Sequence, residues 1–324
     1  MRIWRIFRYI LFLFLLSIGM LIGYVIFEYI QINRTSKLFL GNQPDKLLKM
    51  EKDASREPYT FYVIGDTVGR SDILEEFISR SKERKPAFLV HVGDFVRYPS
   101  LDEHRFFIAE IAETGFNRPI FLVPGNHDIP PDWPSSKELF ENLYGPTNFY
   151  FRFRDSLFIF LSSQKNKSFL NSLKFLEEIL RSDSSQAHYR FIFLHYLPGF
   201  YPDMSIKDNK EAERLLEERL LDLLKRYKVN YVFTGHLHTY YREKVGDCIF
   251  ITPGSGGSTI RRQEIDPNYH SLEITVNPEQ IKERLHSIEK HSISASLPVE
   301  DQMEYYLWTK LVPQIKEKMK NILP

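Results

Sequence analysis

The chain has 324 residues, which is enough for one large domain or two small ones. Its 43 lysines and arginines nearly balance its 42 aspartates and glutamates, so the charge gives no indication of a broad nucleic-acid-binding surface. A single cysteine, Cys248, excludes an internal disulfide framework, and its apolar neighbours favour a buried structural thiol. Aromatic residues make up 15% of the chain. This favours a phenylalanine-rich core, with an apolar substrate groove or bilayer contact as the alternative.

The N-terminal 30 residues differ most sharply in composition from the rest of the chain. The run from Tyr9 to Phe27 carries no charge and is long enough to cross a hydrocarbon core as a helix. Because Arg2, Arg5 and Arg8 precede it, the positive-inside rule predicts a cytoplasmic N-terminus and places the rest of the chain outside the cytoplasm. A cleaved signal peptide is the alternative, but bulky residues follow the run where a cleavage site needs small ones. We therefore predict a single-pass signal anchor over residues 1–30.

Residues 31–58 are polar and charged, which predicts a tether with one short helix around 45–52. Regular elements follow this tether. The first predicted strands cover 59–64, 87–92 and 119–123. One helix is predicted to begin at Ser71, and another to include residues 106–111. An alternation of strands and helices implies right-handed crossovers and neighbouring parallel strands.

The second half of the chain has a mixed pattern. Strands are predicted over 148–153, 156–161, 189–194, 229–233, 240–245, 249–252 and 271–276, and helices over 170–180 and 210–227. Two sheets packed face to face, with helices outside, account for this order. Residues 278–324 are charged, and we expect a helical extension that docks on the domain or contacts a membrane interface.

Five short polar clusters stand where predicted strands end. They are Gly65-Asp66, Gly93-Asp94, Gly125-Asn126-His127-Asp128, His195 and Gly235-His236-Leu237-His238. Aspartate, asparagine and histidine supply the oxygen and nitrogen ligands that hard to borderline divalent metals take. Ligands bind outside the carboxyl ends of strands in open α/β sheets, so these side chains can face one pocket. The pattern predicts a metal-assisted hydrolase.

In this order the clusters resemble the calcineurin-like metallophosphoesterase family, over about Tyr59 to Val276. The resemblance implies an α/β fold, a four-layered α/β/β/α sandwich of two packed mixed sheets, with the catalytic domain over 59–277. It also implies two divalent ions, for which manganese, iron, zinc and magnesium are all candidates. A hydroxide shared by the ions would attack the phosphorus of a phosphomonoester or phosphodiester substrate.

The resemblance further implies a role for each polar side chain. Asp94 would bridge both ions. The remaining ligands would be Asn126, His195 and His236 for one ion, and Asp66 and His238 for the other. His127 would face the leaving-group oxygen as general acid or charge stabiliser, with Asp128 a candidate to orient it.

One position departs from the family pattern. The family usually has histidine two residues after the first aspartate, where this chain has Val68. A branch that resembles purple acid phosphatases also lacks this histidine but uses a tyrosine three residues after the bridging aspartate, where this chain has Arg97. The Asp66 site is therefore expected to be filled by water, to hold metal weakly or to recruit another ligand. A catalytically impaired phosphate-ligand binding or scaffold protein is the alternative function.

Three further features lie near these clusters. His91 should face the opposite side of its strand from Asp94 and belong to the core. Arg70 is predicted either to contact a phosphate or to be a solvated surface residue. The run Gly254–Ser258 lacks the lysine and helix of a phosphate-binding loop and is expected to be a flexible turn near the site. The sequence does not indicate the substrate or the oligomeric state.

Overall fold

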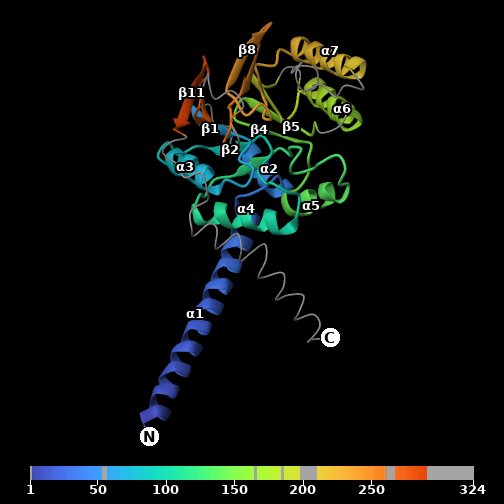
Figure 1. Ribbon diagram of the computed structural model, residues 1–324. Coiled ribbons are helices and arrows are strands. Elements are labelled where there is room, and N and C mark those ends of the chain that lie inside the picture. The colour runs from blue at the N-terminus through green and yellow to red at the C-terminus, as the bar shows by residue number, and fades with distance from the viewer. Residues whose placement is uncertain are drawn as a thin grey trace.

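The computed structural model shows four layers, with helices outside two packed sheets (Figure 1). It describes residues 2–52, 57–163, 166–183, 186–197, 210–258, 260 and 267–289. The predicted α/β/β/α sandwich is therefore confirmed.

The first sheet has five strands in the order β11-β10-β1-β2-β3. Their bounds are β1 Tyr59–Ile64, β2 Phe88–His91, β3 Ile120–Leu122, β10 Tyr269–Val276 and β11 Ile281–Ile288. Strands β1, β2 and β3 are parallel, as the alternation of strands and helices predicts, and β10 pairs with β1 antiparallel. Three helices bury their apolar sides on the outer face of this sheet: α3 (Ser71–Lys82), α4 (Leu101–Glu113) and α5 (Ser135–Tyr144).

The second sheet has six strands in the order β4-β5-β6-β7-β9-β8. Their bounds are β4 Phe149–Phe153, β5 Ser156–Leu161, β6 Tyr189–Leu194, β7 Tyr231–Phe233, β8 Tyr241–Val245 and β9 Cys248–Thr252. Helices α6 (Asn166–Ser182) and α7 (Lys210–Arg226) cover its outer face. Strands β5, β6 and β7 are parallel, so their carboxyl ends share one edge.

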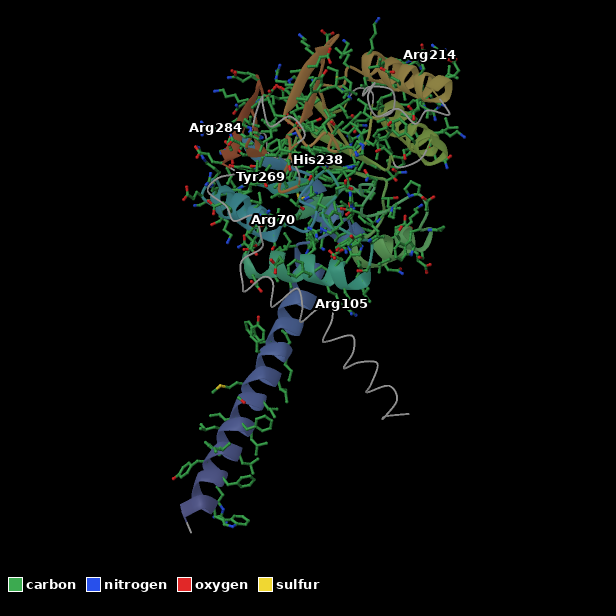
Figure 2. The ribbon with its side chains drawn as sticks, viewed as in Figure 1. Arg70, Arg105, Arg214, His238, Tyr269 and Arg284 are labelled. Carbon is green, nitrogen blue, oxygen red and sulfur yellow. The ribbon has the colours of Figure 1, made fainter. Side chains whose placement is uncertain are left out.

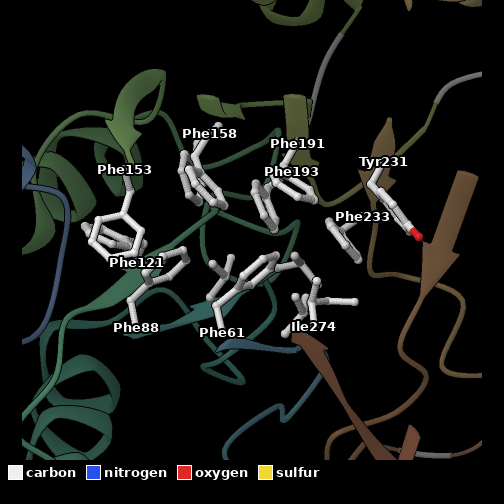
Figure 3. Close-up of a cluster of buried hydrophobic side chains, with 14 of the residues drawn as sticks. Phe61, Phe88, Phe121, Phe153, Phe158, Phe191, Phe193, Tyr231, Phe233 and Ile274 are labelled. Atoms are coloured by element: carbon white, nitrogen blue, oxygen red, sulfur yellow. The ribbon is translucent and has the colours of Figure 1, made fainter. Parts of the chain in front are cut away.

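The space between the sheets is filled largely by aromatic rings (Figure 3). Phe61 stacks on Phe88 with ring centroids 5.1 Å apart, and Phe158 stacks on Phe191 at 5.0 Å. The alternate residues of the second sheet, such as Ile192, point the other way into the α6 and α7 layer. Because both faces of these strands are buried, their sequences are continuously apolar. The prediction of a phenylalanine-rich core is confirmed.

Helix α1 (Arg2–Leu38) extends away from the domain, and its upper end packs against α4 (Figure 1). It is the one helix in the described part of the chain that is long and apolar enough to cross a membrane. None of its apolar window, Phe7–Tyr24, is buried, and its side chains project outward along the helix (Figure 2). A signal sequence near the N-terminus would meet the same criteria of length and apolar composition.

Part of the predicted tether over 31–58 is built into the domain. Ile120 of β3 donates its N–H to the Phe39 carbonyl at 2.8 Å and accepts the Gly41 N–H at 2.9 Å. The short helix expected around 45–52 is present as α2 (Pro44–Glu51) and packs on β4. The free edge of β3 explains this docking, since its unpaired backbone groups need partners.

The structure also differs from the predicted helical extension over 278–324. Residues 281–288 form β11, which pairs antiparallel with β10 along its full length. The exposure of the side chains along β11 largely alternates from one residue to the next. This period of two residues is typical of a half-buried edge strand rather than of a helix. Residues 290–324 lie outside the described residues. Helix α5 was not predicted, because the sequence offers only a short apolar pattern there.

Candidate metal centre

The predicted ligands come from the carboxyl ends of β1, β2, β3, β6 and β7. Two groups of side chains have ligand atoms that all lie within 4.8 Å of one another. The groups are Asp94, His195 and His236, and Asp66, Asp94 and His238. Because an ion of the first transition series or Mg²⁺ lies about 2.0–2.2 Å from each ligand, both groups are compact enough to hold one. Asp94 belongs to both groups, as the bridging role requires.

The Asp94 carboxylate lies at the centre of this arrangement and is 1% exposed. Its Oδ1 accepts the backbone N–H of His127 at 2.7 Å, and its Oδ2 lies 3.3 Å from Nε2 of His195. Burial alone would raise the pKa of Asp94, but the neighbouring His195 and the His127 N–H outweigh it and hold the pKa well below its ordinary value. The carboxylate is therefore kept ionised.

His195 is fully buried and has its ring fixed by a backbone group. Its Nδ1–H donates to the Val92 carbonyl at 2.8 Å, which turns Nε2 toward Asp94 and to within 3.2 Å of Oδ1 of Asn126. Burial lowers the pKa of His195, but the Asp94 carboxylate raises it by more, to about 9. The negative charge of Asp94 therefore favours positive charge in this part of the site.

Asp66 and His238 form the other side of the site. The Asp66 carboxylate is fully buried, and both of its oxygens accept the His236 backbone N–H, at 2.9 and 3.0 Å. Nε2 of His238 lies 3.5 Å from Oδ1 of Asp66. His238 stands in the middle of the domain (Figure 2).

The backbone at the site is strained in a way typical of functional loops. Eight non-glycine residues in the described part of the chain have positive φ, and five of them are at the site: Asp66, Val68, Asp94, His236 and His238. Such conformations cost free energy and persist only where the surroundings enforce them. Gly235 shows the crowding, since a Cβ there would lie 2.7 Å from Nδ1 of His195 and 3.2 Å from Oδ2 of Asp66.

His127 and Asp128 occupy different environments. The Nδ1–H of His127 donates to the Arg97 carbonyl at 2.9 Å, and the ring is partly exposed. Asp128 is fully buried, and its carboxylate accepts the backbone N–H groups of Asp94, Phe95, Val96 and Gly125. Burial and the charge of Asp94 raise the pKa of Asp128 to about 7. In contrast to the predicted role, Asp128 ties two site loops together, and a carbonyl orients the His127 ring.

These loops match a known family pattern. The sequence profile described as calcineurin-like phosphoesterase matches residues 59–240, more than half of the chain. The chain belongs to the calcineurin-like phosphoesterase family. Members of this family are metal-dependent phosphoester hydrolases that use two metal ions.

Several known phosphoesterases are similar to this chain. A Hordeum vulgare protein named nucleotide pyrophosphatase/phosphodiesterase is 22% identical over 257 residues, which cover 65% of this chain and 66%, just under two thirds, of that protein. A dimetal phosphatase from Danio rerio superposes with a TM-score of 0.52 at 12% identity, over 71% of this chain and 97% of that one. Purple acid phosphatase PPD1 from yellow lupin gives a TM-score of 0.54 at 15% identity, over 76% and 56%. The two structures share the fold.

The side chains of this site fit a pair of divalent ions. Asp66 and Asp94 are buried carboxylates whose oxygens lie close together, an arrangement that is costly without positive charge between them. Oxygen and imidazole donors suit manganese, iron and zinc, and the oxygen atoms also suit magnesium. The identity of the metal is open.

The structure also places the remaining candidates. His91 is buried in the core, where burial lowers its pKa to about 3, and its Nε2 lies 3.1 Å from Oγ1 of Thr67. Arg70 forms a forked ion pair with Asp72, with contacts of 2.6 and 2.8 Å. A residue that sequence reasoning missed, Ser258, contacts His238. A serine at the end of a glycine-rich run carries no signal of such a role.

Proposed function

We propose that this chain is a membrane-anchored phosphoesterase that hydrolyses a phosphomonoester or phosphodiester with two divalent ions. The observation that carries this proposal is the shared position of Asp94 between two compact donor groups. One group contains His195 and His236, with Asn126 beside them, and the other contains Asp66 and His238. Two ions at these positions would supply Lewis-acid charge to the phosphate oxygens and lower the pKa of attacking water.

Backbone groups hold two of the ligand side chains in place. The Val92 carbonyl fixes the His195 ring so that Nε2 faces Asp94 and Asn126. The His236 N–H holds the Asp66 carboxylate in place. Such neighbouring hydrogen bonds orient ligands and commonly change metal affinity by about 10–100-fold when they are lost.

His127 is proposed to serve the leaving group. Because its Nδ1–H donates to the Arg97 carbonyl, Nε2 is the ring atom that can meet a substrate. In the protonated ring, Nε2–H would donate a proton to the leaving oxygen, and a positioned acid of this kind contributes about 10²–10⁴-fold to the rate. Its backbone N–H binds Asp94, which ties this acid to the metal ligands.

The first assay should use p-nitrophenyl phosphate and its bis ester with each candidate metal. We expect activity that chelation abolishes and added divalent ions restore.

Asp94→Asn should abolish turnover, because it weakens the ligand that both donor groups share. His127→Ala should lower kcat more on esters with alkyl leaving groups than on nitrophenyl esters, which need little protonation. If both variants keep wild-type turnover, the assigned roles are wrong.

A nucleotide diester or pyrophosphate is the substrate class to test next. The barley relative carries the name nucleotide pyrophosphatase/phosphodiesterase, and this chain matches just under two thirds of it. Hydrolysis of a nucleotide diester faster than of a simple phosphomonoester would support this class, and the reverse order would oppose it.

The alternative function, a binding or scaffold protein with impaired catalysis, rests on Val68. Asp66, Asp94 and His238 nevertheless form a compact donor group without a histidine at position 68. The number of bound ions separates the two functions, since two ions per chain favour the enzyme and one or none favours the binding protein.

A further inference from the structure

The loop between β9 and β10 is pinned to the loop that carries Asp66. Gly256 donates its N–H to the Gly65 carbonyl at 2.8 Å, and Ser258 donates its N–H to the Asp66 carbonyl at 2.9 Å. A side chain at Gly256 would meet the Gly65 carbonyl oxygen at 2.5 Å. The predicted flexible turn over Gly254–Ser258 is therefore held closely against one half of the metal centre.

This contact brings the Ser258 side chain onto a ligand. Its hydroxyl oxygen lies 2.5 Å from Nδ1 of His238 and 3.2 Å from Nε2 of the same ring. Ser258 is 7% exposed, so its hydroxyl is largely shielded from competing water. A second serine steadies the loop, because the Ser255 hydroxyl donates to the Ser258 carbonyl at 2.7 Å.

The other oriented imidazoles of the site follow the same arrangement. Nδ1 of His195 is held by the Val92 carbonyl, and Nδ1 of His127 by the Arg97 carbonyl. His238 differs in that a side-chain hydroxyl stands beside its Nδ1. A ligating histidine commonly donates its second N–H to a neighbouring acceptor, which fixes the tautomer and the ring plane.

We propose that Ser258 is a positioning residue for the metal site that lacks a histidine at position 68. Its hydroxyl accepts the Nδ1–H of His238 and thereby keeps the Nε2 lone pair directed toward Asp66 and Asp94. The inference rests on the proposed function. Among the described residues, the group on the Asp66 side consists of three aspartate and histidine donors, so its affinity depends strongly on how well His238 is oriented.

The test compares Mn²⁺ binding to the full chain in detergent, by calorimetry and by electron paramagnetic resonance. In Ser258→Ala, we expect the weaker Mn²⁺ site to lose about 10–100-fold in affinity while the tighter site is unchanged. In Ser258→Ala, the resonance signal of a coupled Mn²⁺ pair should appear only at a higher Mn²⁺ concentration than in the wild type. Ser258→Thr keeps the hydroxyl and should restore binding.

Ser81→Ala is the matched control. Ser81 is also a buried serine with one hydroxyl hydrogen bond, to the Ile78 carbonyl, and it lies on α3. The Ser81→Ala variant should be less stable than the wild type, with no change in Mn²⁺ affinity. If Ser258→Ala binds both ions as the wild type does, or if Ser258→Thr fails to restore binding, the proposal is overturned.

A measurement on the unaltered protein covers the case in which Ser258→Ala does not fold. Long-range proton–nitrogen spectra of the metal-free chain should show His238 with its proton on Nδ1, and a proton on Nε2 would overturn the proposal. Failure of the proposed function has a different signature, because the wild-type chain would then bind fewer than two Mn²⁺ ions.

Discussion

Val68 is the residue at which the site differs most from its family, and its backbone is strained. Its φ of 48° lies in the left-handed region, which β-branched residues rarely adopt. The conformation is enforced from outside, because Val68 donates its N–H to the Asp94 carbonyl at 2.8 Å. The backbone at position 68 is therefore held beside the Asp94 loop, although the valine side chain supplies no ligand.

Val68→His should strengthen the weaker metal site. An added imidazole on a loop already fixed beside Asp66 should raise Mn²⁺ affinity there by about tenfold or more, as measured by calorimetry. Val68→Ala is the control that removes the valine without adding a ligand, and it should leave the affinity near the wild-type value. Equal affinity in all three proteins would show that position 68 does not face the ion.

The residues that escaped prediction act through backbone or neutral groups. Asp66, Asp94 and the site histidines could be identified because their side chains carry metal chemistry at strand ends. The Arg97 carbonyl that orients His127 has no side-chain signature, and Ser258 follows a glycine run that many surface turns share. Asp128 belongs to the motif, but only the fold reveals that it binds backbone N–H groups.

At the scale of elements, the segment after α1 acts as an added edge of the first sheet. Asn42 is fully buried and pairs with Leu122 as a second backbone would, donating to its carbonyl at 2.8 Å and accepting its N–H at 2.9 Å. It also donates to the Pro146 carbonyl at 3.1 Å. Because β3 leads directly into the Gly125–Asp128 loop, this segment supports the site from the N-terminal side of the domain.

Asn42→Ala should destabilise the domain by about 2–3 kcal/mol, because it leaves the buried polar groups of Leu122 without their partner. Urea unfolding of the detergent-solubilised chain measures this change. Lys49→Ala is the control, since Lys49 lies on the exposed side of α2 and should change stability by less than about 0.5 kcal/mol. A loss below this level for Asn42→Ala would mean that the segment is a loose tether.

The elements differed in how well the sequence predicts them. Strands such as β1 and β6 are continuous apolar runs and were identified, because burial on both faces leaves one interpretation. Strand β11 has apolar residues only at 281, 285 and 288, a spacing closer to that of a helix than to strand alternation, so its pairing with β10 could be found only from the fold. The docked segment at Asn42 was missed because side-chain pairing with a strand edge leaves no periodic pattern.

At the scale of the whole molecule, helix α1 carries the proposal of a membrane anchor and of the side on which the domain lies. Helix α1 has an exposed apolar window, and its upper end packs against α4. Arg2 and Arg5 precede the window and Arg8 lies at its start, which favours a cytoplasmic N-terminus and a domain on the opposite side. This orientation would place the phosphoesterase where extracytoplasmic phosphate esters are available.

Cysteine labelling tests this orientation with little background, because Cys248 is 5% exposed and is the only cysteine. Lys244→Cys places a thiol on the exposed strand β8. A membrane-impermeant maleimide should label it in intact cells, in protein that sediments with membranes. Labelling only after lysis would place the domain in the cytoplasm, and full recovery in the soluble fraction would indicate a cleaved signal sequence.

The central claim is that two ions share Asp94. Anomalous diffraction from crystals soaked in Mn²⁺ tests it most directly. We predict two peaks on either side of the Asp94 carboxylate, one bounded by Asn126, His195 and His236, and the other by Asp66 and His238. A single peak, or peaks that do not touch Asp94, would contradict it.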